Sequence, residues 1–225
     1  MCVDNSQQLP TVLSLCTGYS GIERGLELAG FKHRVVAYVE IEAFAIANLV
    51  NKMETGQMDA APVWTNLKTL PVECFSGCVD VITGGYPCQP FSAAGRRQGK
   101  DDPRHLWPYI KDIINAIRPV RCFFENVEGH ISLGLREVIE DLEGLGYTTT
   151  WGIFSAAEVG APHQRKRVYI LGNSKYHGSS SSEKRGSNEI ALPRGEAKEP
   201  NSTGQLTRTS EPFDGSSSER SKGRK

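Results

Sequence analysis

The sequence lacks the features that would place it in a membrane or mark it for export. No run of about 18 apolar residues occurs, which argues against a membrane span. The polar start, Met1 to Pro10, does not show the basic-then-apolar pattern of a signal peptide. We therefore expect a cytoplasmic protein.

An overall excess of positive or negative charge is also missing, because the formal net charge is zero. The chain alone is thus not expected to be a strong non-specific binder of nucleic acid. Charge is unevenly placed, however: residues 1–172 hold 16 Lys and Arg against 19 Asp and Glu, whereas residues 173–225 hold 10 against 7. A local run, Arg165-Lys166-Arg167, can still supply contacts to phosphates.

Cysteine is sparse and scattered. The six cysteines are Cys2, Cys16, Cys74, Cys78, Cys88 and Cys122. Most stand in apolar, strand-like surroundings without the spacing of a disulfide framework, so we expect reduced thiols. Cys74 and Cys78 have a loosely metal-like separation, but no second Cys or His pair lies near them, and no metal site is expected.

Large apolar residues become rare after Gly172, where the sequence turns to Ser, Gly, Lys, Glu and Pro. Such a segment cannot bury enough surface to offset its ordering entropy. We expect a folded domain over residues 1–172 and a disordered, polar and basic tail over residues 173–225.

Residues 1–172 alternate between apolar segments of strand length and amphipathic segments of helix length. Strands are expected at 11–16, 34–40, near 63, and at 79–83, 121–125, 147–155 and 167–171, and helices at 21–29, 42–50, 105–117 and 133–145. This alternation predicts an α/β fold with a doubly wound, mostly parallel sheet, whose last two strands pair near one edge.

A glycine-containing turn follows the first expected strand and opens a helix. It reads Cys16-Thr17-Gly18-Tyr19-Ser20-Gly21. Gly18 and Gly21 allow a tight turn, and the helix N-terminus offers unpaired N–H groups. Glu40 ends the second strand, where a carboxylate can accept hydrogen bonds from a ribose diol. The pattern favours a ribose-containing cofactor over a plain α/β turn, but it does not separate a dinucleotide from S-adenosylmethionine.

A second candidate site is a cysteine between two prolines. Cys88 lies in Gly84-Gly85-Tyr86-Pro87-Cys88-Gln89-Pro90, at the carboxyl end of an expected strand. Pro87 and Pro90 fix backbone angles on both sides of the thiol. A rigid loop that presents a thiol suits nucleophilic catalysis, whereas the alternative is a buried structural cysteine.

The run Pro87-Cys88-Gln89-Pro90-Phe91-Ser92 resembles the catalytic loop of cytosine-C5 DNA methyltransferases. Further segments resemble that family in the same order: Leu13 to Gly21 with Glu40, Asp102 to Leu106, Phe124 to Val127, and Gly160 to Val168. The resemblance covers about residues 12–172. It implies the Rossmann-like fold of S-adenosylmethionine-dependent methyltransferases and a methyltransferase catalytic domain over residues 1–172.

The resemblance also implies a mechanism on double-stranded DNA. Cys88 would attack C6 of a flipped-out cytosine, and Glu125 would hydrogen-bond N3 and the exocyclic amine. Arg165 and Arg167, which alternate along an expected strand and so share one side of it, would contact the cytosine O2 and favour the thiolate. The activated C5 would then take a methyl group from S-adenosylmethionine.

The same resemblance implies a set of cofactor-binding residues and no metal. They are Cys16, Thr17, Gly18, Tyr19, Ser20, Gly21, Glu40, Ile41, Asn66, Leu67, Pro87 and Leu106. Asn66 stands where the family commonly has an Asp that receives the adenine amine, and it can still accept through its carbonyl oxygen.

Nothing after Gly172 resembles the family's target-recognition region or its last motifs. Two alternatives follow: a truncated, non-catalytic remnant, or half of a split methyltransferase whose second polypeptide supplies target recognition. A tRNA cytosine methyltransferase of the same fold is a further alternative. A nicotinamide oxidoreductase is disfavoured, because nothing in that chemistry needs the Pro-Cys-Gln-Pro loop.

Overall fold

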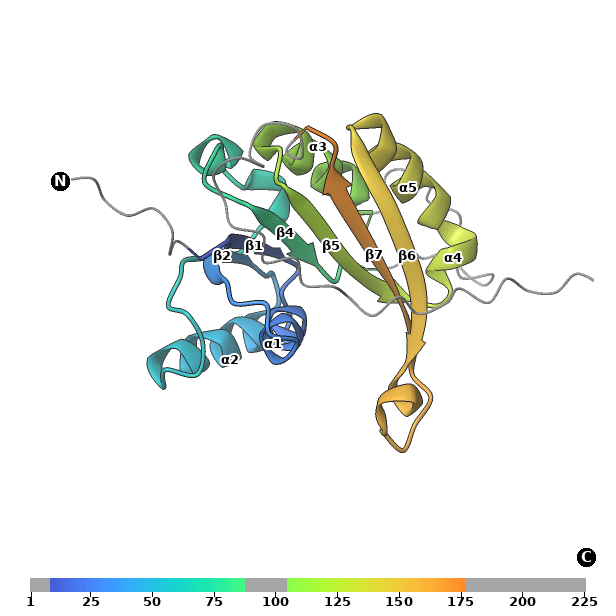
Figure 1. Ribbon diagram of the computed structural model, residues 1–225. Helices are drawn as coiled ribbons and strands as arrows, with labels where there is room; N and C mark the ends of the chain where they lie inside the picture. The colour runs from blue at the N-terminus through green and yellow to red at the C-terminus, as the bar shows by residue number, and fades with distance from the viewer. Residues whose placement is uncertain (1–8, 88–104, 177–225) are drawn as a thin grey trace, which may run out of the picture. The chain divides into compact units, whose positions relative to one another are not determined.

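The computed structural model describes residues 9–87 and 105–176. They form a seven-stranded sheet in the order β3-β2-β1-β4-β5-β7-β6 (Figure 1). The strands are β1 (Thr11–Leu15), β2 (Arg34–Val39), β3 (Val63–Trp64), β4 (Val81–Gly84), β5 (Arg121–Val127), β6 (Tyr147–Ser155) and β7 (Lys166–Ser174). Residues 177–225 of the predicted tail, and the predicted nucleophile Cys88, lie outside the described residues.

Helices cover the sheet on both faces. They are α1 (Gly21–Leu28), α2 (Ala43–Glu54), α3 (Trp107–Ile117), α4 (His130–Leu133) and α5 (Leu135–Gly144), with short 3-10 turns at Leu67–Thr69, Val72–Phe75 and Ala156–Val159. The helices α1 and α2 lie together on one side, and α3 and α5 lie on the other (Figure 1). The predicted doubly wound α/β architecture is confirmed.

The pairing of the strands confirms a mostly parallel sheet. Strands β3, β2, β1, β4 and β5 pair in parallel, whereas β7 runs antiparallel to both β5 and β6. Chain order reverses direction between β1 and β4, because β2 and β3 lie beyond β1 while β5 lies beyond β4. Open α/β sheets bind ligands at such a switch point, outside the carboxyl ends of the strands.

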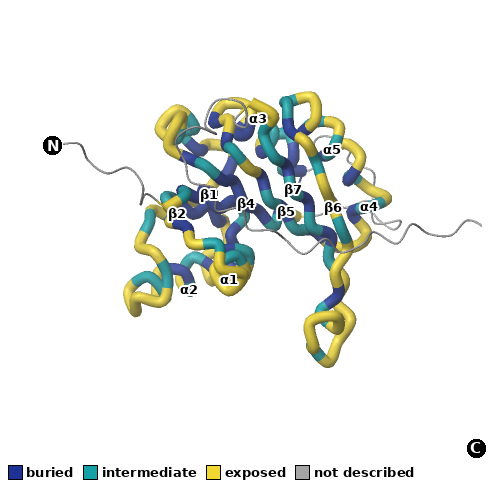
Figure 2. Tube along the Cα trace, viewed as in Figure 1, coloured by how far each residue is buried: buried dark blue, intermediate teal, exposed yellow. Residues whose placement is uncertain are grey.

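The core explains why the strands were recognisable as apolar runs. Every residue of β1 and of β4 is buried, as a central parallel strand covered on both faces requires (Figure 2). Helix α3 presents one apolar face to the sheet, made of Trp107, Ile110, Ile113, Ile114 and Ile117. Their spacing of three and four residues is that of one side of a helix.

Among the differences from the expected boundaries, three are the largest. The helix expected over 133–145 is two helices, separated at Gly134, which is not helical. A Cβ atom on Gly134 would lie 2.9 Å from Cε1 of His130, so only glycine fits there without a shift. Helix α2 extends to Glu54, and β7 extends to Ser174, two residues past the expected end of the folded domain at Gly172.

Candidate active site at the carboxyl edge of the sheet

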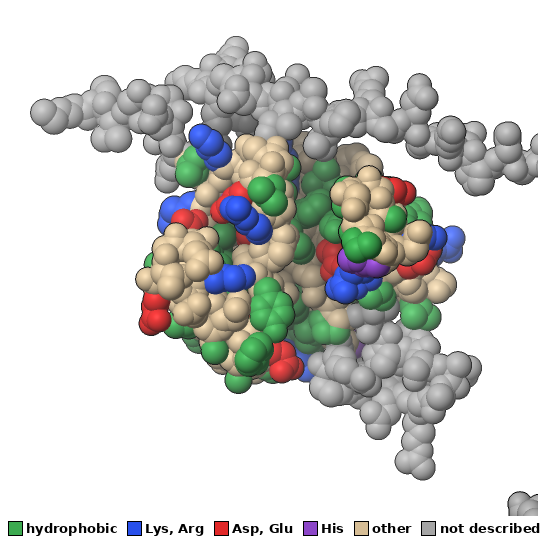
Figure 3. Space-filling model, turned by 90° about the horizontal axis from the view of Figure 1, so that it is seen from below, with side chains coloured by type: hydrophobic (Ala, Val, Ile, Leu, Met, Phe, Trp, Pro, Cys, Tyr) green, Lys and Arg blue, Asp and Glu red, His purple; other side chains and the backbone are tan. Residues whose placement is uncertain are grey.

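The turns that follow β1, β2 and β4 all leave the sheet at its carboxyl edge, which faces the viewer in Figure 3. This view shows a recess in the surface with basic and acidic side chains gathered beside it. Pro87, the last described residue before Cys88, is exposed and lies three residues after the end of β4. The loop that carries the predicted nucleophile therefore starts at this edge.

The turn after β1 has left-handed backbone at three positions. Cys16, Gly18 and Ser20 have φ values of 49°, 56° and 62°. A Cβ atom at Gly18 would meet no heavy atom within 4 Å, so the space beside the turn is open. Glycine is therefore favoured at this position by the positive φ and not by a lack of space. This arrangement exposes backbone to a ligand.

Glu40 braces that turn. Its Oε2 accepts a hydrogen bond from the Gly18 N–H at 2.6 Å, and its Oε1 accepts from the N–H groups of Ile41 and Glu42, each at 2.8 Å. The structure thus brings the predicted acid to the predicted glycine turn. A ligand diol placed here would meet a carboxylate that is already oriented by three backbone donors.

Cys16 is not a second nucleophile candidate. Burial, followed by the nearby charge of Glu40, raises the pKa of its thiol to about 12. The thiol therefore stays protonated at neutral pH, and the nucleophilic form of cysteine is the thiolate.

Exposed apolar side chains occur in the turn after β1 and in the segment that follows Glu40. Tyr19, Ile41 and Phe44 are exposed, the last two by 72% and 79%. Large exposed apolar side chains next to a turn with bare backbone suit a planar ring. Of these, Tyr19 and Ile41 are predicted cofactor residues, whereas Phe44, in the first turn of α2, was not predicted.

The remaining predicted cofactor residues take different positions. Asn66 caps the 3-10 turn at Leu67–Thr69, where its Oδ1 accepts from the Lys68 N–H at 3.0 Å. Leu67 is buried in the core at 8% exposure, and Leu106 packs against the same core at the start of α3. Asn66 follows β3 at the carboxyl edge, whereas the two leucines pack in or against the hydrophobic core.

The predicted catalytic acid is paired with a predicted arginine. Glu125 Oε1 lies 2.6 Å from Nε of Arg167, and both side chains are about a quarter exposed. The two residues come from antiparallel neighbours, in which Val127 of β5 pairs with Arg167 of β7. A fixed ion pair at an accessible edge holds the carboxylate in one orientation.

Glu125 also lies against the loop that leads to Cys88. A Cβ atom on Gly85 would come within 3.3 Å of Oε2 of Glu125, so the absence of a side chain at Gly85 lets the carboxylate approach the backbone. The structure therefore brings together Glu125, Arg167 and the start of the predicted nucleophile loop.

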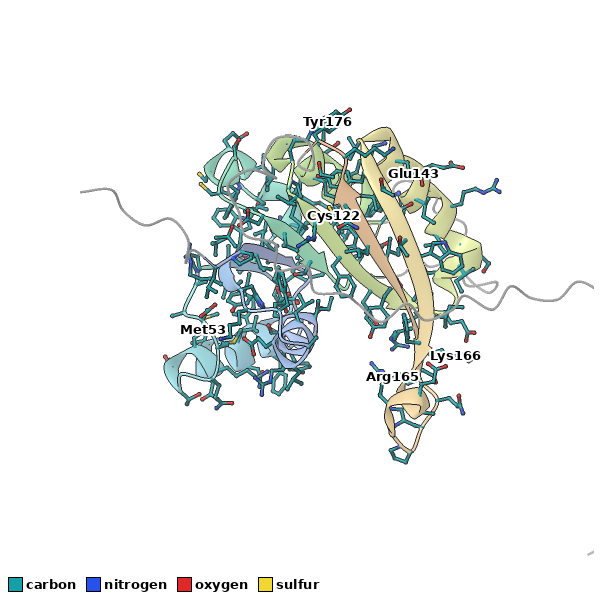
Figure 4. The ribbon with its side chains drawn as sticks, viewed as in Figure 1. Met53, Cys122, Glu143, Arg165, Lys166 and Tyr176 are labelled. Carbon is teal, nitrogen blue, oxygen red and sulfur yellow. The ribbon has the colours of Figure 1, made fainter. Side chains whose placement is uncertain are left out.

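Arg165 does not share a strand face with Arg167, and that expectation is wrong. Strand β7 begins at Lys166, and Arg165 precedes it with a φ of 28° in the hairpin from β6 (Figure 4). The charge of Arg165 nevertheless acts on Tyr169, the residue of β7 that pairs with Glu125. Burial and Glu125 raise the pKa of Tyr169, while Arg167 and Arg165 oppose that rise.

Asn126 anchors the same loop through the backbone. Its Nδ2 donates to the carbonyl oxygen of Tyr86 at 3.1 Å, and its Oδ1 accepts from the Val127 N–H at 2.9 Å. The Tyr86 hydroxyl lies 3.0 Å from Nε2 of His130. Burial lowers the pKa of His130, so its ring is neutral at pH 7. Both contacts hold the residue that precedes Pro87 and Cys88, and neither was predicted.

Within residues 9–87 and 105–176, no group of three or more His, Cys, Asp or Glu side chains is placed to bind a metal ion. No helix in these same ranges has the length and apolar character needed to cross a membrane.

Comparison with solved structures defines the fold class. The chain superposes on Dnmt2 methyltransferase of Schizosaccharomyces pombe with a TM-score of 0.61 over 84% of this chain and 58% of that one, at 24% identity. DNMT2 of Spodoptera frugiperda gives a TM-score of 0.61 at 24% identity, over 79% and 53% of the two chains. The fold is therefore the Rossmann-like methyltransferase fold, as predicted.

Sequence comparison then identifies the family. Residues 10–221 match the C-5 cytosine-specific DNA methylase family. The chain is 32% identical over 165 residues to the type II methyltransferase M.NaeI of Lentzea aerocolonigenes, covering 71% of this chain and 39% of the relative. It is 33% identical over 166 residues to M.NgoMIV of Neisseria gonorrhoeae, covering 72% and 51%. The chain belongs to this family, and it spans about two fifths to one half of these relatives.

Proposed function

We propose that this chain carries out methyl transfer from S-adenosylmethionine to C5 of cytosine in double-stranded DNA. The observation that carries the proposal is the placement of the Glu125–Arg167 ion pair against Gly85, three residues before Cys88, in a chain of the C-5 cytosine methylase family. A fixed carboxylate beside a nucleophile loop is what activation of a cytosine ring requires.

The turn after β1 fits S-adenosylmethionine. Gly18 leaves open space above the backbone, Glu40 presents an oriented carboxylate, and Ile41 offers an exposed apolar surface. In this assignment Glu40 would hold the ribose diol, Ile41 would contact the adenine ring, and Asn66 would accept from the adenine amine. When bound, the cofactor supplies the electrophilic methyl group.

The chain's own residues would perform the activation. The Cys88 thiolate adds to C6 of the cytosine, forming an S–C6 bond and breaking the C5–C6 π bond, whose electron pair makes C5 nucleophilic. Glu125 hydrogen-bonds N3 and the exocyclic amine and so offsets the charge that develops on the ring. After C5 is methylated, loss of the C5 proton returns an electron pair to the ring and expels the Cys88 thiolate.

Arg167 would have two roles in this scheme. Its pairing with Glu125 holds the carboxylate in place, and its positive charge beside the loop favours the thiolate form of Cys88. Arg165, in the hairpin, would contact the base or the phosphates of a flipped-out nucleotide. Recognition of a particular DNA sequence would depend on polypeptide that corresponds to the unmatched part of the relatives. The same protein or a second one would supply it.

A covalent-trapping experiment tests the proposal. The chain is incubated with S-adenosylmethionine and duplex DNA that contains 5-fluorocytosine, which cannot lose a C5 proton, and the product is separated under denaturing conditions. We expect a protein–DNA adduct that Cys88→Ala abolishes. The matched control is Cys74→Ala, which removes an exposed thiol and should leave the adduct unchanged.

Two results would reject the proposal. One is an adduct that persists in Cys88→Ala, which would assign the nucleophile elsewhere. The other is no adduct from the wild-type chain, even with the unmatched part of M.NgoMIV supplied as a separate polypeptide, under conditions where intact M.NgoMIV forms one.

A further inference from the structure

A buried acid lies beneath the turn after β1. Glu23 is 4% exposed, and it is the buried residue of α1, whose other side chains are half-buried or exposed. Its Oε2 accepts a hydrogen bond from the Ser20 hydroxyl at 2.8 Å, and its Oε1 accepts from the Thr83 hydroxyl at 2.5 Å. One carboxylate therefore joins two segments that lie 60 residues apart in the chain.

On the turn side, Glu23 supports a strained residue. Ser20 has a φ of 62°, in the left-handed region that favours glycine. It stands at the N-cap of α1, but its hydroxyl makes no capping bond to the helix backbone and points to Glu23 instead. Glu40 holds the same turn at Gly18. Two carboxylates thus hold one turn, Glu40 at Gly18 and Glu23 at Ser20.

On the strand side, Glu23 reaches the carboxyl end of β4. Thr83 is fully buried and lies between Ser14 of β1 and Phe123 of β5 in the sheet. The residues that follow are Gly84 and then Gly85, against which Glu125 lies. A displacement of Thr83 would therefore move the start of the loop to Cys88.

The chemistry of the contact makes it a rigid one. A buried carboxylate without donors is costly, so both hydroxyl protons are directed at Glu23 rather than free to rotate. Charge-assisted hydrogen bonds of this kind are shorter and stronger than neutral ones.

We propose that Glu23 is a positioning residue that locks the turn holding S-adenosylmethionine onto the end of β4. The two halves of the site, the cofactor turn and the strand before the nucleophile loop, then move as one unit. The identity of the ligand rests on the proposed function, whereas the link through Glu23 and Thr83 rests on the contacts described above.

Binding of S-adenosylhomocysteine, measured by isothermal titration calorimetry on the full chain, tests the link without requiring catalysis. Glu23→Ala removes both hydrogen bonds and should weaken binding about tenfold or more. Glu23→Gln keeps the shape, and its amide can accept from one hydroxyl and donate to the other, so affinity should stay within about threefold.

Thr83 gives the more informative variants, because it lies on a strand and not in the cofactor turn. Thr83→Val removes the hydroxyl at constant volume and should weaken binding by about tenfold, whereas Thr83→Ser keeps the hydroxyl and should bind nearly as the wild type does. The double variant Glu23→Ala/Thr83→Val should bind no more weakly than Glu23→Ala alone, since both remove one connection.

A merely structural role predicts a different pattern. If the variants unfold at lower temperature but bind S-adenosylhomocysteine as the wild type does, or if the two single effects add in the double variant, the positioning role is overturned. If the wild-type chain does not bind S-adenosylhomocysteine at all, the proposed function fails together with this inference. The wild-type measurement therefore separates the two failures.

Discussion

Replacing Asn126 tests how the loop before Cys88 is anchored. Asn126 is 3% exposed and makes two side-chain hydrogen bonds, to the Tyr86 carbonyl oxygen and to the Val127 N–H. Each buried hydrogen bond contributes about 0.5–1.5 kcal/mol net, so Asn126→Ala should lower the free energy of unfolding by about 1–3 kcal/mol. The exposed Asn51 in α2 is the matched control, and Asn51→Ala should change stability by less than about 0.5 kcal/mol.

The isosteric change Asn126→Asp separates anchoring from simple loss of volume. An ionised Asp keeps the acceptor for Val127 but has no donor for the Tyr86 carbonyl oxygen, whereas a protonated Asp regains one. The folded pKa of the new carboxyl should therefore lie above its unfolded value of about 3.9. Its stabilising effect is complete below that pH and is lost as the pH rises through the folded pKa.

Urea unfolding, followed by tryptophan fluorescence between pH 4 and pH 7, measures both effects relative to the wild type. Asn126→Asp should approach the wild type at the acid end of this range and fall below it at pH 7. A stability of Asn126→Ala within about 0.5 kcal/mol of the wild type would refute the anchoring role. So would a difference between Asn126→Asp and the wild type that does not vary with pH.

Three further predictions follow from single residues. Burial lowers the pKa of His130, so its contribution to stability is present above about pH 6.5 and is lost as the pH falls, by at most about 1.4 kcal/mol per pH unit. Urea unfolding at pH 7 and pH 5.5 should show this dependence of the free energy of unfolding on pH, and His130→Phe should reduce it. Gly146 has a φ of +90° and packs against the Tyr176 ring, so Gly146→Ala should lower the free energy of unfolding by about 1–2 kcal/mol in the same assay, and an unchanged value would contradict the geometry. Because burial and Glu40 raise the pKa of Cys16 to about 12, iodoacetamide at pH 8 should modify the exposed Cys74 far faster than Cys16, and equal rates in peptide mass spectrometry would show that Cys16 is not protected.

The fold could be predicted from the sequence because its signals are local. Strands β1 and β4 are buried on both faces and read as short apolar runs, and α3 shows its apolar side at helical spacing. The break at Gly134 could not be predicted, because the apolar positions Leu135, Val138 and Leu142 continue at helical spacing beyond it. The break becomes evident only from the packing of His130 against Gly134.

Candidate site residues could be named where a local signal marks them, but contacts that span the chain could not. Glu40 was named from its position after the second strand, and Glu125, which lies inside β5, from the resemblance of Phe124 to Val127 to a family motif. The hydrogen bonds from Thr83 to Glu23 and between Tyr86 and His130 join residues 60 and 44 positions apart, and no local pattern marks them. Arg165 was misplaced because the hairpin geometry, and not the alternation of side chains, sets the start of β7.

Release of tritium from DNA labelled at cytosine C5 tests the central claim most directly, because a methyl group can replace the C5 hydrogen only if that hydrogen leaves. We expect release that requires S-adenosylmethionine, disappears in Cys88→Ala, and falls strongly in Glu125→Gln. Methyl transfer to DNA without tritium release would contradict the account, since the methyl group would then reside on another atom. Release that persists in Cys88→Ala would contradict it as well.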